Sequence, residues 1–166
     1  LLDISGRSRK SQIKLAEEFG IMSYPSPAGG CLLTEKSYSS RLKDLFNHQD
    51  SYTEEELHLL KYGRHLRLSK NTKIIVGRTQ KDNKKIKKYY DPSVDTLIKV
   101  KNFPGPTVLM PTIGGKEMMI LAASICAGYS KAPDAEPVEV SAVTPKGFEI
   151  FKVIPILPAN IRHFLI

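Results

Sequence analysis

The spacing of apolar positions divides the chain into a helical first part and a largely extended second part. Up to about residue 63 the apolar residues recur three or four positions apart, which is the helical period. Helices are therefore predicted over 7–19, 37–47 and 53–62. The last of these opens with a capping box at Thr53 and is closed by Gly63.

From residue 64 apolar residues alternate with polar ones or form short β-branched runs, the pattern of strands. Strands are predicted over 64–68, 73–77, 96–100, 107–110, 138–143 and 148–154, and a further short strand over 31–34. Helices are predicted over 80–90 and 116–130. The fold class is therefore α+β: a helical segment, 1–63, precedes a compact domain, 64–166, in which two helices cover an antiparallel or mixed sheet.

Composition excludes several classes of protein. The chain is 41% apolar and 25% charged, as globular domains are. Its longest apolar runs, such as 118–123, are far shorter than the ~20 residues that span a bilayer, so no membrane association is expected. Two cysteines without patterned spacing predict reduced thiols and a cytoplasmic protein. The chain opens on Leu1 and is interpreted as a piece of a longer protein.

Positive charge is concentrated in one window. The net charge is +8, yet residues 64–90 alone contain 10 basic residues and one acidic residue, while the flanking segments are almost neutral. A local field of this kind attracts polyanions. The alternative is a solvated helix face that binds nothing. A membrane-surface helix is disfavoured, because Ile86 is the one apolar residue within 80–88.

A phosphate site is predicted where a strand ends at Gly77 and a helix follows. Arg78 emerges there at the helix N-terminus, where backbone amides and the helix dipole favour an anion. A turn arginine beside a capped helix is the plainer alternative. Tyr89, Tyr90 and Phe103 could stack on bases near this surface or belong to the core.

Motifs for enzymatic chemistry are mostly missing. The histidines have no ligand-like spacing with either cysteine, so no zinc or other metal site is predicted, and no phosphate-binding loop predicts a cofactor. Cys31 is the one candidate catalytic residue, because a tight turn at Gly29-Gly30 could leave amides that stabilise a thiolate. Cys31 could equally be a small core residue, and Cys126 is predicted to be buried in a helix.

Three strings in the second part, 75–83, 103–109 and 122–132, resemble the RNA-binding domain of the NFACT family, found in ribosome-quality-control proteins. They occur in the family's order within residues 71–155. Thr79 stands where most members have Asn, and Pro106-Thr107 replaces the family's Ser-His. The resemblance implies an RNA-binding α+β domain.

Three strings in the first part, 15–21, 29–33 and 38–46, resemble the linker that follows the ATP-binding domain in bacterial tRNA 2-thiouridylases, which belong to the PP-loop class. This resemblance implies that Cys31 carries a persulfide, that a missing upstream domain binds ATP, and that a sulfur-donor protein is a partner.

The expected function is therefore binding of RNA, above all tRNA, by the C-terminal portion of an enzyme that modifies tRNA by sulfur transfer. The chain alone is not expected to be an enzyme. The alternatives are a non-catalytic ribosome or tRNA adaptor of the NFACT type, and a basic window that serves only solubility. The predicted RNA contacts are Arg64, Arg67, Lys73, Arg78, Lys81, Lys84, Lys85, Lys87 and Lys88.

Overall fold

The computed structural model describes residues 9–23, 31–112 and 114–166 of the 166-residue chain. It divides into two compact units, Leu1–Cys31 and Leu32–Ile166. The first unit contains α1 (Lys10–Glu18), which lies within the predicted helix 7–19; positions 7 and 8 are outside the described residues. None of the helices in the described part has the length and apolar character that a bilayer crossing requires.

The second unit is built on one antiparallel sheet, and its α+β class is as predicted. Within the described residues the strand order is β1-β2-β4-β3-β5-β6. The strands are β1 (Arg64–Ser69), β2 (Thr72–Val76), β3 (Thr96–Val100), β4 (Val108–Met110), β5 (Val138–Thr144) and β6 (Gly147–Val153). Each of their bounds lies within one residue of the strand predicted from alternation or from a β-branched run, because alternating side chains face opposite sides of a sheet and β-branched residues favour strands.

One face of the sheet is covered by α5 (Lys116–Gly128). Its small side chains, such as Ala122, Ala123 and Cys126, are fully buried and let the helix approach the strands closely. They pack with Ile98 and Val108 in the main hydrophobic core. Most side chains of α5 are buried or partly buried, which explains why this helix is apolar on nearly all of its faces.

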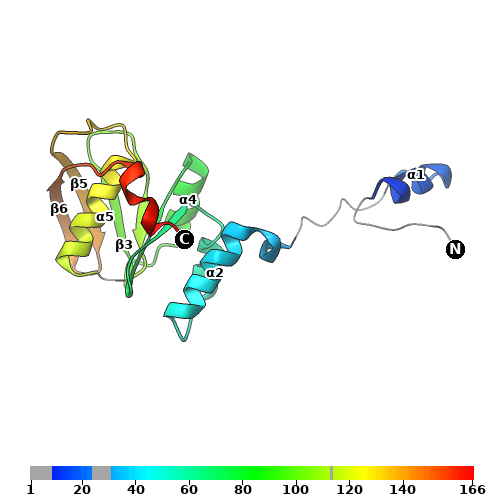
Figure 1. Cartoon of the computed structure of the whole chain (residues 1–166), viewed down its shortest axis with the longest axis horizontal. Helices are drawn as coiled ribbons and strands as arrows, with labels where there is room; N and C mark the ends of the chain where they lie inside the picture. The colour runs from blue at the N-terminus through cyan, green and yellow to red at the C-terminus, as the bar shows by residue number, and fades with distance from the viewer. Residues whose placement is uncertain (1–8, 24–30, 113) are drawn as a thin grey trace. The chain divides into compact units, whose positions relative to one another are not determined.

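The opposite face is covered by α3 (Glu54–Leu59) and α4 (Gln80–Lys88), so that α4 and α5 lie on opposite sides of β3 (Figure 1). Leu59 and Ile86 pack on Ile75 and Leu109 in a second core cluster. Tyr89 and Tyr90 pack against the same cluster, whereas Phe103 is exposed. Of the three aromatic candidates for base stacking, the two tyrosines therefore contribute to the core.

This second layer stops short of the far strands. On β5 and β6 the side chains that share its face, Val143, Phe148 and Ile150, are 42%, 62% and 49% exposed. Phe151 and Val153, which point to the α5 side, are instead packed in or against the main core. On this face β5 and β6 thus have an apolar surface that the described residues leave largely exposed.

The segment before the sheet differs in part from its prediction. Residues 32–34 form a 3-10 helix (Leu32–Thr34), not a strand, and it leads directly into α2 (Lys36–His48). Glu35 donates its backbone N–H to the Leu32 carbonyl at 3.0 Å, and the Ser39 hydroxyl donates to the Leu33 carbonyl. These local bonds use backbone groups that a strand would need for pairing.

Helix α3 begins with the predicted capping box. The Thr53 N–H donates to the Glu56 carboxylate at 2.9 Å, and the Glu56 N–H donates to the Thr53 hydroxyl at 3.3 Å. The chain then turns at Gly63, whose φ is +74° and where a Cβ would lie 2.7 Å from the Val76 carbonyl oxygen. Buried Arg41 of α2 donates to the carbonyls of Leu60 (2.8 Å) and Gly63 (3.1 Å). Arg41 thus binds α2 to the segment between α3 and β1.

Candidate nucleic-acid interface

Three segments far apart in the sequence meet beside the N-terminus of α4. The Asn83 side-chain oxygen accepts the Thr107 N–H at 2.9 Å, and the Gly77 N–H donates to the Thr107 carbonyl at 3.0 Å. The Lys131 N–H donates to the Pro104 carbonyl at 2.9 Å. The turn 103–107 is therefore held between α4 and the residues that follow α5. These contacts join the three strings on which the NFACT resemblance rests.

Gly77 is required for this junction. A Cβ at position 77 would lie 2.0 Å from the Asn83 side-chain oxygen. A shift of a few tenths of an ångström would not remove this clash. Without a side chain at Gly77, the Asn83 amide can approach the backbone and reach Thr107.

A groove runs along this junction, and its first half lies between α4 and the turn 103–107. It is lined by Gln80, Asn83, Lys84, Lys87, Lys99, Val100, Phe103, Gly105, Pro106 and Thr107. None of these described lining residues is acidic. Burial and, after it, the neighbouring ammonium group of Lys87 lower the pKa of Lys99. Two cations are thus held together without an anion between them.

The second half of the groove adds two arginines and an aromatic ring. It is lined by Arg64, Gly77, Arg78, Thr79, Gln80, Asn83, Pro104, Gly105, Pro106, Tyr129 and Lys131. The Arg64 guanidinium lies 4.9 Å from the centre of the Tyr129 ring, within cation–π range. Because Gln80, Asn83, Gly105 and Pro106 line both halves, the two form one continuous surface. We call this surface the basic groove.

Arg78 lies in the basic groove, and its side chain is bound to the first turn of α4. The Asp82 carboxylate accepts the backbone N–H of Arg78 at 3.2 Å and its Nε–H at 3.1 Å. The Asp82 N–H in turn donates to the Thr79 hydroxyl at 3.1 Å. The N–H groups of Arg78 and Asp82 therefore already have acceptors, and Arg78 would bind an anion through the outer nitrogens of its guanidinium, which Asp82 orients.

The lysines of α4 are divided between different faces of the helix. Lys84 and Lys87 line the basic groove, while Ile86 points into the core. Lys81 and Lys88 are exposed but line neither half of the groove. Lys85, also outside the groove lining, is partly buried. The helix therefore offers lysines inside and outside the groove at almost the same sequence positions.

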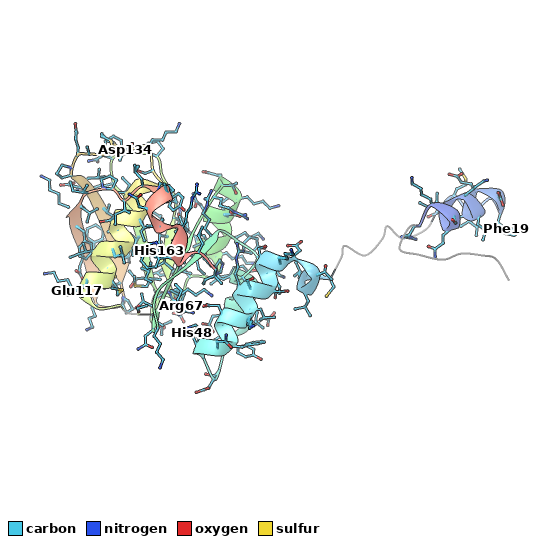
Figure 2. All side chains as sticks on the ribbon, viewed as in Figure 1. Phe19, His48, Arg67, Glu117, Asp134 and His163 are labelled. Atoms are coloured by element: carbon cyan, nitrogen blue, oxygen red, sulfur yellow. The ribbon has the colours of Figure 1, made fainter. Side chains whose placement is uncertain are left out.

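Arg67 and Lys73 lie elsewhere, on the side of the sheet that faces α2. The Asp44 carboxylate accepts hydrogen bonds from the Arg67 guanidinium, with Nε–Oδ1 at 3.1 Å, and lies 3.6 Å from the Lys73 ammonium. His48, 3.5 Å from Asp44, lies next to Arg67 in Figure 2. We call Asp44, Arg67 and Lys73 the Asp44 cluster.

The pKa shifts of this cluster reflect burial with a partner. Burial lowers the pKa of Lys73 to about 8, against the opposing attraction of Asp44. For Asp44 burial acts to raise the pKa, but the hydrogen bond and charge of Arg67 hold it below its ordinary value. The charges of Arg67 and Lys73 are therefore compensated within the protein.

The two cysteines have different surroundings. Cys31 is exposed, whereas Cys126 is buried in α5, as predicted. Burial raises the pKa of the Cys126 thiol to about 12. The Gly29-Gly30 turn expected to activate Cys31 lies outside the described residues. In the described part of the chain, no group of three or more His, Cys, Asp or Glu side chains is arranged to hold a metal ion.

Comparison with protein families identifies the second unit. The model of the NFACT protein RNA binding domain matches residues 63–165. The chain belongs to this family. The three strings that join at the turn 103–107 thus form part of an NFACT RNA-binding domain, and RNA is the partner class that the family name states.

Among solved structures, the C-terminal part of the fibronectin/fibrinogen-binding protein from Streptococcus suis is similar in fold. The match has a TM-score of 0.55 at 18% identity and covers 81% of this chain. The chain spans about 64% of that solved chain. A search of curated proteins found no match.

The NFACT domain of this chain also has groove residues that sequence reasoning missed. They are Lys99, Tyr129 and Lys131. Lys99 interrupts an apolar strand on the side opposite Ile98, and alternation alone indicates that it points away from the main core. Tyr129 and Lys131 belong to the third matching string, but nothing local in the sequence connects them to α4.

Proposed function

We propose that this NFACT domain binds the phosphodiester backbone of structured RNA, tRNA above all, in the basic groove. The observation that supports the proposal is the convergence of Lys84, Lys87 and Lys99 with no acidic residue among the described lining residues. A phosphate placed between them replaces repulsion by attraction and opposes the lowering of the Lys99 pKa.

The chemistry of the groove favours recognition of backbone and shape over base sequence. An ammonium group acts as a compact charge that binds phosphate without reading a base edge. Structured RNA presents closely spaced phosphates to such a surface, and its deep major groove is closed to side chains. The proposal therefore requires affinity for folded RNA with strong salt dependence and little sequence preference.

The test compares lysines inside and outside the groove. In K84Q/K87Q two groove cations are lost, while in K81Q/K88Q two cations are lost from the same helix outside it. Glutamine keeps helix propensity and much of the side-chain length. We expect the first variant to bind tRNA about tenfold more weakly, with a salt slope smaller by about 2, and the second to bind within about threefold of the unchanged chain.

Filter binding over a salt series measures both quantities. For the unchanged chain, about five phosphate contacts predict a loss of roughly two orders of magnitude in affinity between 50 and 200 mM salt. Equal losses of tRNA affinity in the two double variants would contradict a binding site in the groove. RNA would then bind to the lysines of α4 without preference for one face. A flat salt profile would contradict electrostatic binding altogether.

We infer, as a separate prediction, that Cys31 transfers sulfur to tRNA. This role also requires the expected upstream ATP-binding domain and a sulfur donor. The exposure of Cys31 and the burial of Cys126 support it, because an exposed thiol is the more reactive of the two. Mass-resolved labelling with iodoacetamide near pH 7 tests it, with Cys126 as the internal control. Labelling of Cys31 as slow as that of Cys126 would end this role and leave the adaptor function.

A further inference from the structure

On the face of the sheet that α3 and α4 cover elsewhere, β5 and β6 bear an apolar patch with one aromatic ring. Phe148 on β6 is paired with Val143 on β5, and Ile150 is paired with Ser141. Cross-strand partners point to the same face, so Val143, Phe148 and Ile150 form one surface, which we call the β5–β6 patch. An exposed aromatic side chain beside two aliphatic ones is uncommon on a face that no described residue covers.

The β5–β6 patch continues the basic groove. Lys99, which lines the groove, is paired with Ser141, and Ser141 is paired with Ile150 in the next strand. The Ser141 hydroxyl donates to the Lys99 carbonyl at 3.1 Å. Strands lie ~4.8 Å apart, so Val143 on β5 is one strand from the strand of Lys99, and Phe148 and Ile150 on β6 are two strands, or about 10 Å, away. Neighbouring nucleotides of a single strand can bridge that separation.

Charges on this face favour a polyanion over a protein partner of mixed charge. Glu139 is paired in register with Lys152 and forms an ion pair with Lys101 at 3.2 Å. Lys99 adds a further positive charge, and by register Glu149 points to the other side of the sheet, with Phe151. The face therefore has three lysines against one carboxylate around an apolar centre.

We propose that the β5–β6 patch is a stacking platform for unpaired bases of an RNA strand whose phosphates occupy the basic groove. Bases stack on exposed aromatic rings in a sequence-tolerant way, and basic side chains beside the ring hold the backbone. The platform extends recognition from the phosphate backbone to single-stranded nucleotides. This inference rests on the proposed groove, but its experiment separates the two.

The absence of tryptophan from the chain makes a direct reporter available. In F148W an indole replaces the exposed ring and retains its stacking surface. In the control, I120W, the indole stands on the exposed side of α5, a helix that covers the opposite face of the sheet. Uridylate 12-mers serve as the probe, and inorganic polyphosphate serves as a polyanion without bases. Anisotropy of labelled RNA measures binding independently.

We expect uridylate 12-mers to quench the F148W emission and leave the I120W emission unchanged. Polyphosphate should compete for the groove without quenching, and a fully paired RNA duplex should bind without quenching. F148A should weaken binding of the 12-mer by about tenfold and that of polyphosphate by less than twofold. Because Phe148 is exposed, circular dichroism should show an unchanged fold in every variant.

Three outcomes would overturn the proposal. If anisotropy shows binding of the 12-mer but the F148W emission stays constant, the groove remains and the platform is wrong. If the emission changes with protein concentration in the absence of RNA, the β5–β6 patch is a contact between copies of this chain. If neither the 12-mer nor tRNA binds, the platform and the groove fail together.

Discussion

The basic groove and the Asp44 cluster are built from the same kinds of side chain, yet their electrostatics differ. Arg67 and Lys73 have Asp44 within hydrogen-bond or ion-pair distance and lie partly or wholly buried. Lys87 and Lys99 are held close together with no carboxylate among the described residues that line their half of the groove. One site is a closed ion pair between elements of the fold, and the other presents lysines with no carboxylate among the described residues that line their half of the groove.

The difference shows that a basic residue is a stronger candidate for RNA binding where the fold leaves its charge uncompensated, as at Lys84, Lys87 and Lys99. Both regions contribute basic residues to the positive window at 64–90, Arg67 and Lys73 in the cluster and Arg64, Arg78, Lys84 and Lys87 in the groove. What separates them is α2, which contributes Asp44 from 20 or more residues upstream. An ion pair of this kind holds α2 on the sheet, whereas the open cations remain available for phosphates.

The largest effect is expected from D44A, which removes the shared anion and leaves the charges of Arg67 and Lys73 without a partner. The free energy of unfolding should fall by about 3 kcal/mol, because uncompensated buried charges are strongly destabilising. Urea denaturation measures it. D50A is the control, because Asp50 is exposed near the end of the same helix and its loss should change stability by less than about 0.5 kcal/mol. Equal changes in the free energy of unfolding for D44A and D50A would mean that the Asp44 cluster stabilises the fold no more than an exposed ion pair does.

A smaller effect is expected from the pH dependence of Lys73. The unfolded chain keeps this proton up to about pH 10.5, whereas the native chain releases it near pH 8. Protonated Lys73 thus lowers stability below pH 8, and stability should rise between pH 8 and 10 by about 2 kcal/mol. In K73M this rise should disappear and stability at pH 7 should increase. Lower stability of K73M at pH 7 would mean that attraction to Asp44 outweighs burial.

The smallest effect is expected in RNA affinity when single arginines of the two regions are exchanged for alanine. R78A should weaken tRNA binding about fivefold, or ~1 kcal/mol, because the outer nitrogens of Arg78 face the basic groove. R67A should leave the affinity within twofold, measured at a temperature where circular dichroism shows it folded. A larger loss of affinity in R67A than in R78A would reverse the comparison between the regions.

Much of the fold could be predicted because local rules decide it. Alternation and β-branched runs predicted every strand of the sheet, and the capping box predicted the start of α3 at Thr53. The 3-10 helix at 32–34 was missed, since a short apolar run before a helix reads as a strand when its local hydrogen bonds are unknown.

The site could be predicted less well, because it depends on which elements the fold brings together. Charge density indicated α4, and that helix does line the groove. Charge density could not show that Lys84 lines the groove and Lys81 does not, because this depends on how α4 is oriented on the sheet. Nor could it connect Lys131 with α4, because their contact passes through the turn 103–107.

The junction at Gly77 has a consequence for the evolution of this surface. A residue with a side chain at position 77 would strike the Asn83 oxygen, and without Asn83 the turn 103–107 would lose the acceptor that holds Thr107. Neither position can therefore change alone without moving the turn. Among homologues we expect positions 77 and 83 to vary as a pair, so that a sequence lacking glycine at 77 also lacks the amide at 83 and has a groove of different shape.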